Sequence, residues 1–129
     1  MGAGYATDLL YHSQLLKLQQ DHPNFTYITA ISRQRQDDGH DPLYVQDRLQ
    51  THRDLLIPIL DSERTLVYVC GLAGMELGIF QKMAAFLPDH ALARFLQVDP
   101  AARVEVHAWQ RSMLHKQVKP TRRVFLEVY

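Results

Sequence analysis

Cysteine, net charge and long hydrophobic runs are the scarce features of this sequence. One cysteine in 129 residues excludes an internal disulfide and a zinc site built from thiolates, and it favours a reducing compartment such as a cytoplasm or a plastid interior. Fourteen basic side chains balance fourteen acidic ones, so no overall field attracts a nucleic-acid backbone. The longest apolar runs, such as residues 55–60, are far shorter than the roughly 20 residues of a membrane helix. We therefore expect no membrane span and no nucleic-acid partner.

Helices and strands are predicted to alternate along the chain. Apolar residues at helical spacing predict helices over residues 8–21, 43–60 and 75–86, with Thr7 or Asp8 as the first N-cap and Pro58 ending or kinking the second helix. Apolar, β-branched and aromatic runs predict strands over residues 25–31, 66–70 and 123–128. Residues 33–42 are typical of an exposed loop, and residues 87–118 of two short helices between breakers. This alternation predicts an α/β fold with a parallel sheet and flanking helices.

Ser32 and Arg33 follow the predicted strand at 25–31 directly. Ligands of open parallel sheets bind beyond the carboxyl ends of the strands, where a hydroxyl and a guanidinium can hold a phosphate by charge-assisted hydrogen bonds. On these two residues alone, the start of a solvated loop is the simpler interpretation.

A glycine-containing loop follows the strand at 66–70. The segment CGLAGMELGI at 70–79 leads from that strand into the helix at 75–86, the place where anionic and nucleotide ligands dock in α/β sheets. Cys70 by itself is typical of a small buried hydrophobe. The small Gly71 and Gly74, however, provide the room that a close ligand needs.

These motifs have a common register. Arg33 and Tyr44 are eleven residues apart, Tyr44 begins a Y-x-Q triplet, and Cys70 follows 26 residues after Tyr44. The chain thereby resembles the carboxyl-terminal NADP(H)-binding half of plant-type ferredoxin:NADP(H) reductases. That family has an S-R pair, Y-x-Q and C-G-L-x-G-M-E-x-G-I at the same separations.

The resemblance implies a nucleotide site with an adenosine end. Ser32 and Arg33 would hold the 2′-phosphate that distinguishes NADP from NAD. Tyr44 would stack on the adenine and reach the same phosphate, and Gln46 would contact the adenosine. The family's lysine two residues before the tyrosine is replaced by Pro42, and Arg35 is the residue that would compensate.

The resemblance also implies a nicotinamide end. Cys70 would line the nicotinamide side together with the loop that follows it, formed by Gly71, Leu72, Gly74 and Met75. The terminal Glu127 and Tyr129 match the family's glutamate and its flavin-stacking tyrosine, which moves aside for the nicotinamide. Alternation along the last strand places both on one face. A solvent-facing glutamate on an edge strand is the alternative for Glu127.

Parts of the family's architecture are expected to lie outside these 129 residues. The family binds FAD in a barrel that precedes this region, together with the first strand of the nucleotide domain and its glycine loop. With the family's strand order 3-2-1-4-5, that strand belongs between the segments at 25–31 and 66–70. We thus interpret residues 1–129 as a partial NADP(H)-binding domain. Truncation is the preferred explanation, and a different pairing or a second chain filling the gap are the alternatives.

The resulting hypothesis is the NADP(H)-binding part of a ferredoxin reductase-like flavoenzyme. Such an enzyme transfers hydride between NADPH and FAD and passes electrons to ferredoxin or a similar iron–sulfur protein. The alternatives are the reductase component of an oxygenase, or a nucleotide-binding module or fragment without catalysis.

Two charged clusters remain outside this hypothesis. The acidic group around His40 is interpreted as a solvated loop rather than a metal site, and consists of Asp37, Asp38, His40 and Asp41. The basic cluster near the carboxyl terminus would dock an acidic partner or be solvated, with solvation preferred, and consists of Lys116, Lys119, Arg122 and Arg123.

Overall fold

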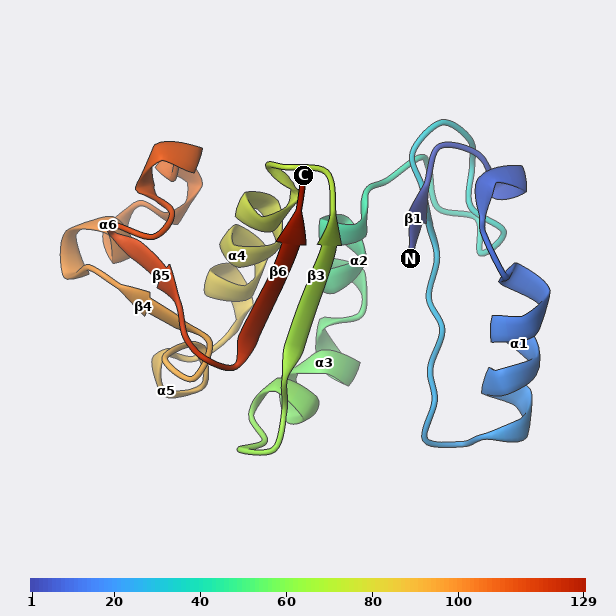
Figure 1. The fold of residues 1–129 in the computed structure, drawn as a ribbon, viewed down its shortest axis with the longest axis horizontal. Coiled ribbons are helices and arrows are strands. Elements are labelled where there is room, and N and C mark those ends of the chain that lie inside the picture. Colours follow the sequence, from blue (N-terminus) through green and yellow to red (C-terminus); the bar gives the residue numbers. More distant parts are fainter. The chain divides into compact units, whose positions relative to one another are not determined.

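The computed structural model describes residues 1–129, and they form two compact units. The first unit is Met1–Arg48 and the second is Leu49–Tyr129. Figure 1 labels the helices and strands of both units.

The first unit contains a short pair of parallel strands and one long helix. Strand β1 (Gly2–Ala3) pairs with β2 (Ala30–Ile31), with Gly2 opposite Ala30. A 3₁₀ turn η1 (Ala6–Asp8) and helix α1 (His12–Asp21) connect the two strands. The predicted strand at 25–31 is thus too long, because β1 offers only two residues for the ladder.

Helix α1 begins later than the predicted residue 8. Tyr11 has φ 56° and ψ 23°, a left-handed conformation that cannot belong to the helix, so α1 starts at His12. Asp8 does serve as a cap, but of η1, where its carboxylate accepts the backbone N–H of Tyr5 at 3.1 Å. At the other end, the backbone N–H of His22 bonds the carbonyl of Leu18 at 2.9 Å.

The single helix predicted over 43–60 is two helices. Helix α2 (Val45–Thr51) and helix α3 (Arg53–Leu60) are separated by His52, whose φ of −113° and ψ of 20° are not helical. Pro58 lies inside α3, which ends two residues later.

The second unit is built on two longer parallel strands, β3 (Val67–Gly71) and β6 (Val124–Val128). Their register places Cys70 opposite Glu127. Helix α4 (Met75–Phe86) has the predicted bounds and lies beside this pair (Figure 1). Its buried Phe80 and Met83 share a hydrophobic core with Val69 of β3 and Val124 of β6.

The segment at 87–118 contains the two predicted short helices and also two strands that were not predicted, the second of which extends to residue 120. The helices are α5 (Asp89–Leu92) and α6 (Pro100–Val104), and η2 (Val106–Ala108) and η3 (Arg111–Met113) are 3₁₀ turns. Strands β4 (Leu96–Val98) and β5 (Val118–Pro120) pair antiparallel. Three residues a strand are too few to give a period-two pattern.

The two parallel pairs differ at their outer edges. On the side of β2 away from β1, Ile31 donates its N–H to Gln36 Oε1 at 2.9 Å and accepts from Gln36 Nε2 at 2.6 Å. Strand β3 pairs with β6 alone. Val67 and Gly71 bond toward β6, through Arg123 O at 2.8 Å and Tyr129 N at 3.1 Å. Alternation therefore turns the backbone groups of Tyr68 and Cys70 to an edge without a partner strand.

Candidate functional site

The structure brings Ser32 and Tyr44 together at the carboxyl end of β2. The backbone N–H of Leu43 donates to the carbonyl of Ile31 at 3.0 Å, which joins the two ends of the loop at 32–43. The Tyr44 side chain is 61% exposed at the start of α2. Its backbone N–H is capped by Asp47 Oδ2 at 3.0 Å, which fixes its position at the first turn. An exposed aromatic ring thus lies near the strand end that carries the Ser-Arg pair.

Ser32 and Arg33 are held by their backbones and leave their side chains accessible. Ser32 N donates to Ala3 O at 3.0 Å, and Arg33 N donates to Gly4 O at 2.9 Å. The Ser32 hydroxyl also lies 3.4 Å from Ala3 O, a long bond that a better acceptor can replace. The exposed Arg33 guanidinium makes no hydrogen bond or ion pair within the chain, and its Cζ lies 5.9 Å from the centre of the Tyr5 ring.

Gln46 and Arg35 are placed differently from this pair. Gln46 is half-buried in the first turn of α2. Arg35 Nε donates to the carbonyl of Gly39 at 3.1 Å and lies 3.8 Å from Asp41 Oδ1. Arg35 therefore binds its own loop, whereas the side chain of Arg33 remains available.

The buried Arg48 organises this loop and was missed by the sequence analysis. Its Nε donates to Thr29 O at 2.7 Å, its Nη1 to Asp38 Oδ2 at 2.6 Å, and its Nη2 lies 3.4 Å from Gln36 Oε1. The Arg48 guanidinium, and then the His40 ring, hold the pKa of Asp38 well below its ordinary value. A solitary arginine in a polar helix gave no sequence signal for this role.

Part of the predicted acidic loop is therefore structural. Asp38 is the ion-pair partner of Arg48, and its other oxygen lies 2.9 Å from His40 Nδ1. Asp37 and Asp41 are exposed. Nowhere in the chain do three or more histidine, cysteine or acidic side chains form a group suited to a metal ion.

In the second unit, the predicted nicotinamide-end residues converge on the carboxyl ends of β3 and β6. Cys70 and Glu127 are exposed register partners on these strands. The backbone of Tyr129 is bonded on both sides, from its N–H to Gly71 O at 3.1 Å and from Ala73 N–H to its carbonyl at 3.0 Å. The last residue is thus fixed in the sheet, while its side chain is 80% exposed.

The loop between β3 and α4 is shaped by Gly74 and Glu76. Gly74 has φ 104°, a conformation that side chains rarely adopt, and it is the N-cap of α4. The buried Glu76 turns back so that its Oε2 accepts the Gly74 N–H at 2.7 Å. Leu72 is 72% exposed in this loop, and Met75 starts the helix. Glu76 was not assigned a role from the sequence, although an acidic residue in the first turn of a helix is a known capping signal.

In the basic cluster near the carboxyl terminus, one side chain is hydrogen-bonded within the chain and three are exposed. Arg123 donates to the backbone carbonyls of Glu63 and Thr65. Lys116, Lys119 and Arg122 are exposed. A docking role is open to these three side chains alone.

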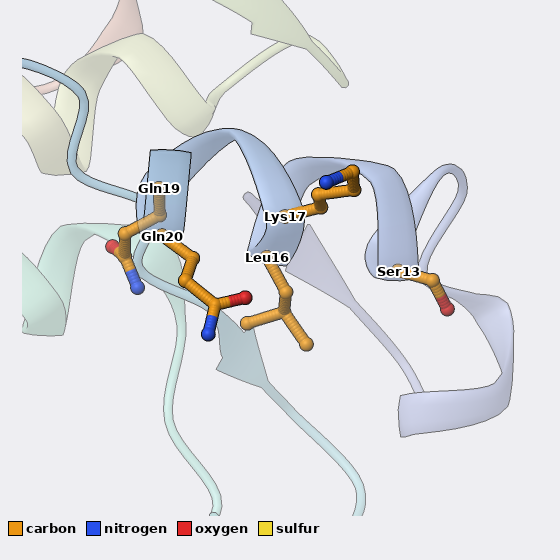
Figure 2. Close-up of a pocket in the computed structure, with 5 residues that line it drawn as sticks. All are labelled: Ser13, Leu16, Lys17, Gln19 and Gln20. Carbon is orange, nitrogen blue, oxygen red and sulfur yellow. The ribbon is translucent and has the colours of Figure 1, made fainter. Parts of the chain in front are cut away.

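A separate hollow lies on helix α1. Figure 2 shows its lining, which comes entirely from that helix and consists of Ser13, Leu16, Lys17, Gln19 and Gln20. Its volume is about 560 Å³. Lys17 is paired with Asp21 at 2.9 Å, and Gln19 Oε1 accepts the Tyr27 N–H at 2.6 Å. None of the residues predicted to bind nucleotide lies there, so we place the candidate site at the strand ends.

Comparison with known proteins decides the family. The family model described as the oxidoreductase NAD-binding domain matches residues 1–80, which contain the Ser-Arg pair, Tyr44 and the loop after β3. The chain belongs to this family. The predicted resemblance to the NADP-binding domain of ferredoxin–NADP reductases is supported by this match and by the relatives below, and the α/β fold with parallel strands agrees with such a domain.

Several curated ferredoxin–NADP reductases are similar to this NAD-binding domain chain. The Spirulina protein is 39% identical over 85 residues, which are 65% of this chain and 29% of that protein. The Thermosynechococcus vestitus protein is 36% identical over 85 residues, which are 65% of this chain and 22% of that protein. The chloroplastic leaf-type isozyme of Nicotiana tabacum is 33% identical over 86 residues, which are 66% of this chain and 24% of that protein. The chain thus spans less than a third of the length of these relatives. No helix in it is both long and apolar enough to cross a membrane.

Proposed function

We propose that this chain is the NADP(H)-binding part of a ferredoxin–NADP reductase-like flavoenzyme, and that residues 1–129 serve as one partial nucleotide domain. The observation that carries the proposal is the 3.0 Å bond from Leu43 N to Ile31 O, because it joins the Ser-Arg pair to Tyr44 at the end of a parallel strand. A phosphate and an adenine, separated by one ribose, would be bound at such a place.

In this proposal the first unit binds the adenosine end. Arg33 and the Ser32 hydroxyl donate to the 2′-phosphate, and neither side chain has a strong competing partner in the chain. The exposed Tyr44 ring stacks on the adenine, and Gln46, in the first turn of α2, contacts the adenosine. A ligand here would supply the anionic partner that the Arg33 guanidinium lacks.

The second unit binds the nicotinamide end. Cys70 and Glu127 lie side by side on the face of the sheet that carries Tyr129, and the loop with Leu72 and Gly74 adjoins it. FAD, held by a domain outside these residues, supplies the chemistry of accepting or giving hydride. The chain's own residues would orient the nicotinamide, and the exposed Tyr129 ring would be the side chain that stacks on the flavin and moves aside for the nicotinamide.

The electron partner in this proposal is ferredoxin or a similar iron–sulfur protein, in a cytoplasm or a plastid-like compartment. The names of the relatives support the partner, and the name of the Nicotiana tabacum relative states a chloroplastic location. The exposed Lys116, Lys119 and Arg122 offer a positive surface to an acidic protein.

The test is calorimetric titration of the purified chain with 2′,5′-ADP and with 5′-AMP, which differ only in the 2′-phosphate. We expect tighter binding of 2′,5′-ADP. Arg33→Ala should weaken it by about 1.5 to 3 kcal/mol, or roughly 10- to 150-fold, because a charge-assisted contact is lost, and should leave 5′-AMP unchanged.

Arg35→Ala is the matched control, since Arg35 lies two residues away but binds its own loop. It should change neither affinity. Equal weakening of both nucleotides by Arg33→Ala, or binding of neither nucleotide by the wild-type chain, would refute the proposal.

A further inference from the structure

The loop after β1 lies directly against the Ser-Arg pair. Arg33 N donates to Gly4 O at 2.9 Å, and Ala6 N donates to the side-chain Oε1 of Gln34 at 3.2 Å. These bonds tie the loop at 4–8 to the loop that follows β2. Tyr5 is held between them, and it lies outside every motif recognised in the sequence.

The Tyr5 ring is the side-chain contact of the Arg33 guanidinium. The guanidinium carbon is 5.9 Å from the ring centre, within the range of a cation–π interaction. A guanidinium on an aromatic face keeps its N–H groups available, because they donate in its own plane. Arg33 uses none of those groups within the chain, so the ring limits its orientation without occupying its donors.

Tyr5 is itself fixed in place. Its backbone N–H donates to Asp8 Oδ2 at 3.1 Å, and its carbonyl accepts the Asp8 N–H at 3.0 Å. These two hydrogen bonds between Tyr5 and Asp8 hold the backbone of Tyr5 at the start of η1. The side chain is 46% exposed, so its ring is not required to fill a core.

We propose that Tyr5 is a positioning residue that holds the Arg33 guanidinium ready for a phosphate monoester, and thereby strengthens the binding of nucleotides with a 2′-phosphate. The inference rests on the proposed function, in which Arg33 binds that phosphate. A flexible arginine must lose rotamer freedom when it binds an anion, and a side chain already held in place loses less. The benefit is therefore limited to ligands that Arg33 contacts.

The test compares two variants of Tyr5 by titration with 2′,5′-ADP and 5′-AMP. Tyr5→Leu removes the ring, and we expect it to weaken 2′,5′-ADP about 2- to 5-fold, as expected for an exposed cation–π contact, while 5′-AMP is unchanged. Tyr5→Phe keeps the ring and should bind both as the wild type does. Tyr11→Leu is the control, because Tyr11 is an exposed tyrosine of the same unit, without a contact to Arg33.

Circular dichroism establishes that each variant is folded, and Tyr5→Gln replaces Tyr5→Leu if the latter is not. The inference is overturned if loss of the ring leaves 2′,5′-ADP unaffected, if it weakens both nucleotides equally, or if Tyr5→Phe behaves as Tyr5→Leu does. The proposed function fails separately, and this inference with it, if the wild-type chain does not distinguish 2′,5′-ADP from 5′-AMP or binds neither.

Discussion

Replacing Arg48 by methionine should destabilise the first unit markedly. Methionine keeps much of the length of the side chain but removes the guanidinium, which bonds Thr29 O, Asp38 Oδ2 and Gln36 Oε1. Arg48 is 8% exposed, so water does not readily replace these bonds. The loop that joins Ser32 to Tyr44 would lose its main anchor.

The magnitude follows from what each acceptor loses. The partly buried Thr29 carbonyl is left without the Arg48 donor, which costs about 1 to 3 kcal/mol. Gln36 Oε1 still accepts from Ile31 N, and the Asp38 side chain is 45% exposed and becomes hydrated, so its ion pair contributes about 1 kcal/mol or less. The total loss in the free energy of unfolding is about 1 to 4 kcal/mol.

Urea unfolding monitored by circular dichroism measures this loss. Hydrogen exchange at the amides of Ile31 and Leu43 shows whether it arises in the first unit, since both amides should exchange faster. Arg35→Met is the control, because that side chain is 74% exposed, and it should change stability by about 0.5 kcal/mol or less. If Arg48→Met were no more destabilising than Arg35→Met, the anchoring role would be wrong.

Two further predictions concern one exposed and one buried group. Because Arg48 and His40 lower the pKa of Asp38, its ionised form stabilises the fold above the ordinary carboxyl pKa of about 4, and this contribution is lost as the pH falls below it. Asp38→Asn should therefore lower the free energy of unfolding by about 1 kcal/mol or less at pH 7. In urea unfolding, the difference in stability between the wild type and this variant should shrink below about pH 4. A difference that does not depend on pH contradicts this prediction. Trp109→Phe should lower the free energy of unfolding by about 1.5 to 3 kcal/mol, because the 4% exposed indole donates to Ala102 O at 2.8 Å. Thermal unfolding measures this loss, and an unchanged midpoint would show that the bond contributes little.

The sequence predicted the elements whose own residues determine them. Helix α4 starts after a glycine with a left-handed backbone and ends where Pro88 follows, so both bounds are local. Strands β3 and β6 are within one residue of the predicted limits, because each is a continuous apolar or alternating run. The parallel pairing followed from the order of helices and strands.

The elements that were missed depend on distant partners. Residues 25–29 have strand-like composition but no ladder, since β1 is two residues long. The break at His52 and the antiparallel pair β4–β5 leave no periodic signal. For the candidate site, a fixed spacing identified Ser32, Arg33 and Tyr44, whereas Tyr5 and Arg48 contribute through contacts that only the folded chain creates.

The outer edge of β3, which has no partner strand, is a place where copies of residues 1–129 can associate. Residues 65–73 contain no charged residue and no proline, so the edge lacks the usual devices that discourage strand-to-strand association. The net charge is zero, so little long-range repulsion keeps two copies apart. In contrast, the Gln36 amide occupies the outer edge of β2 and closes it to such pairing. In a sample of residues 1–129, we therefore expect strand-to-strand association at the unpaired backbone groups of Tyr68 and Cys70.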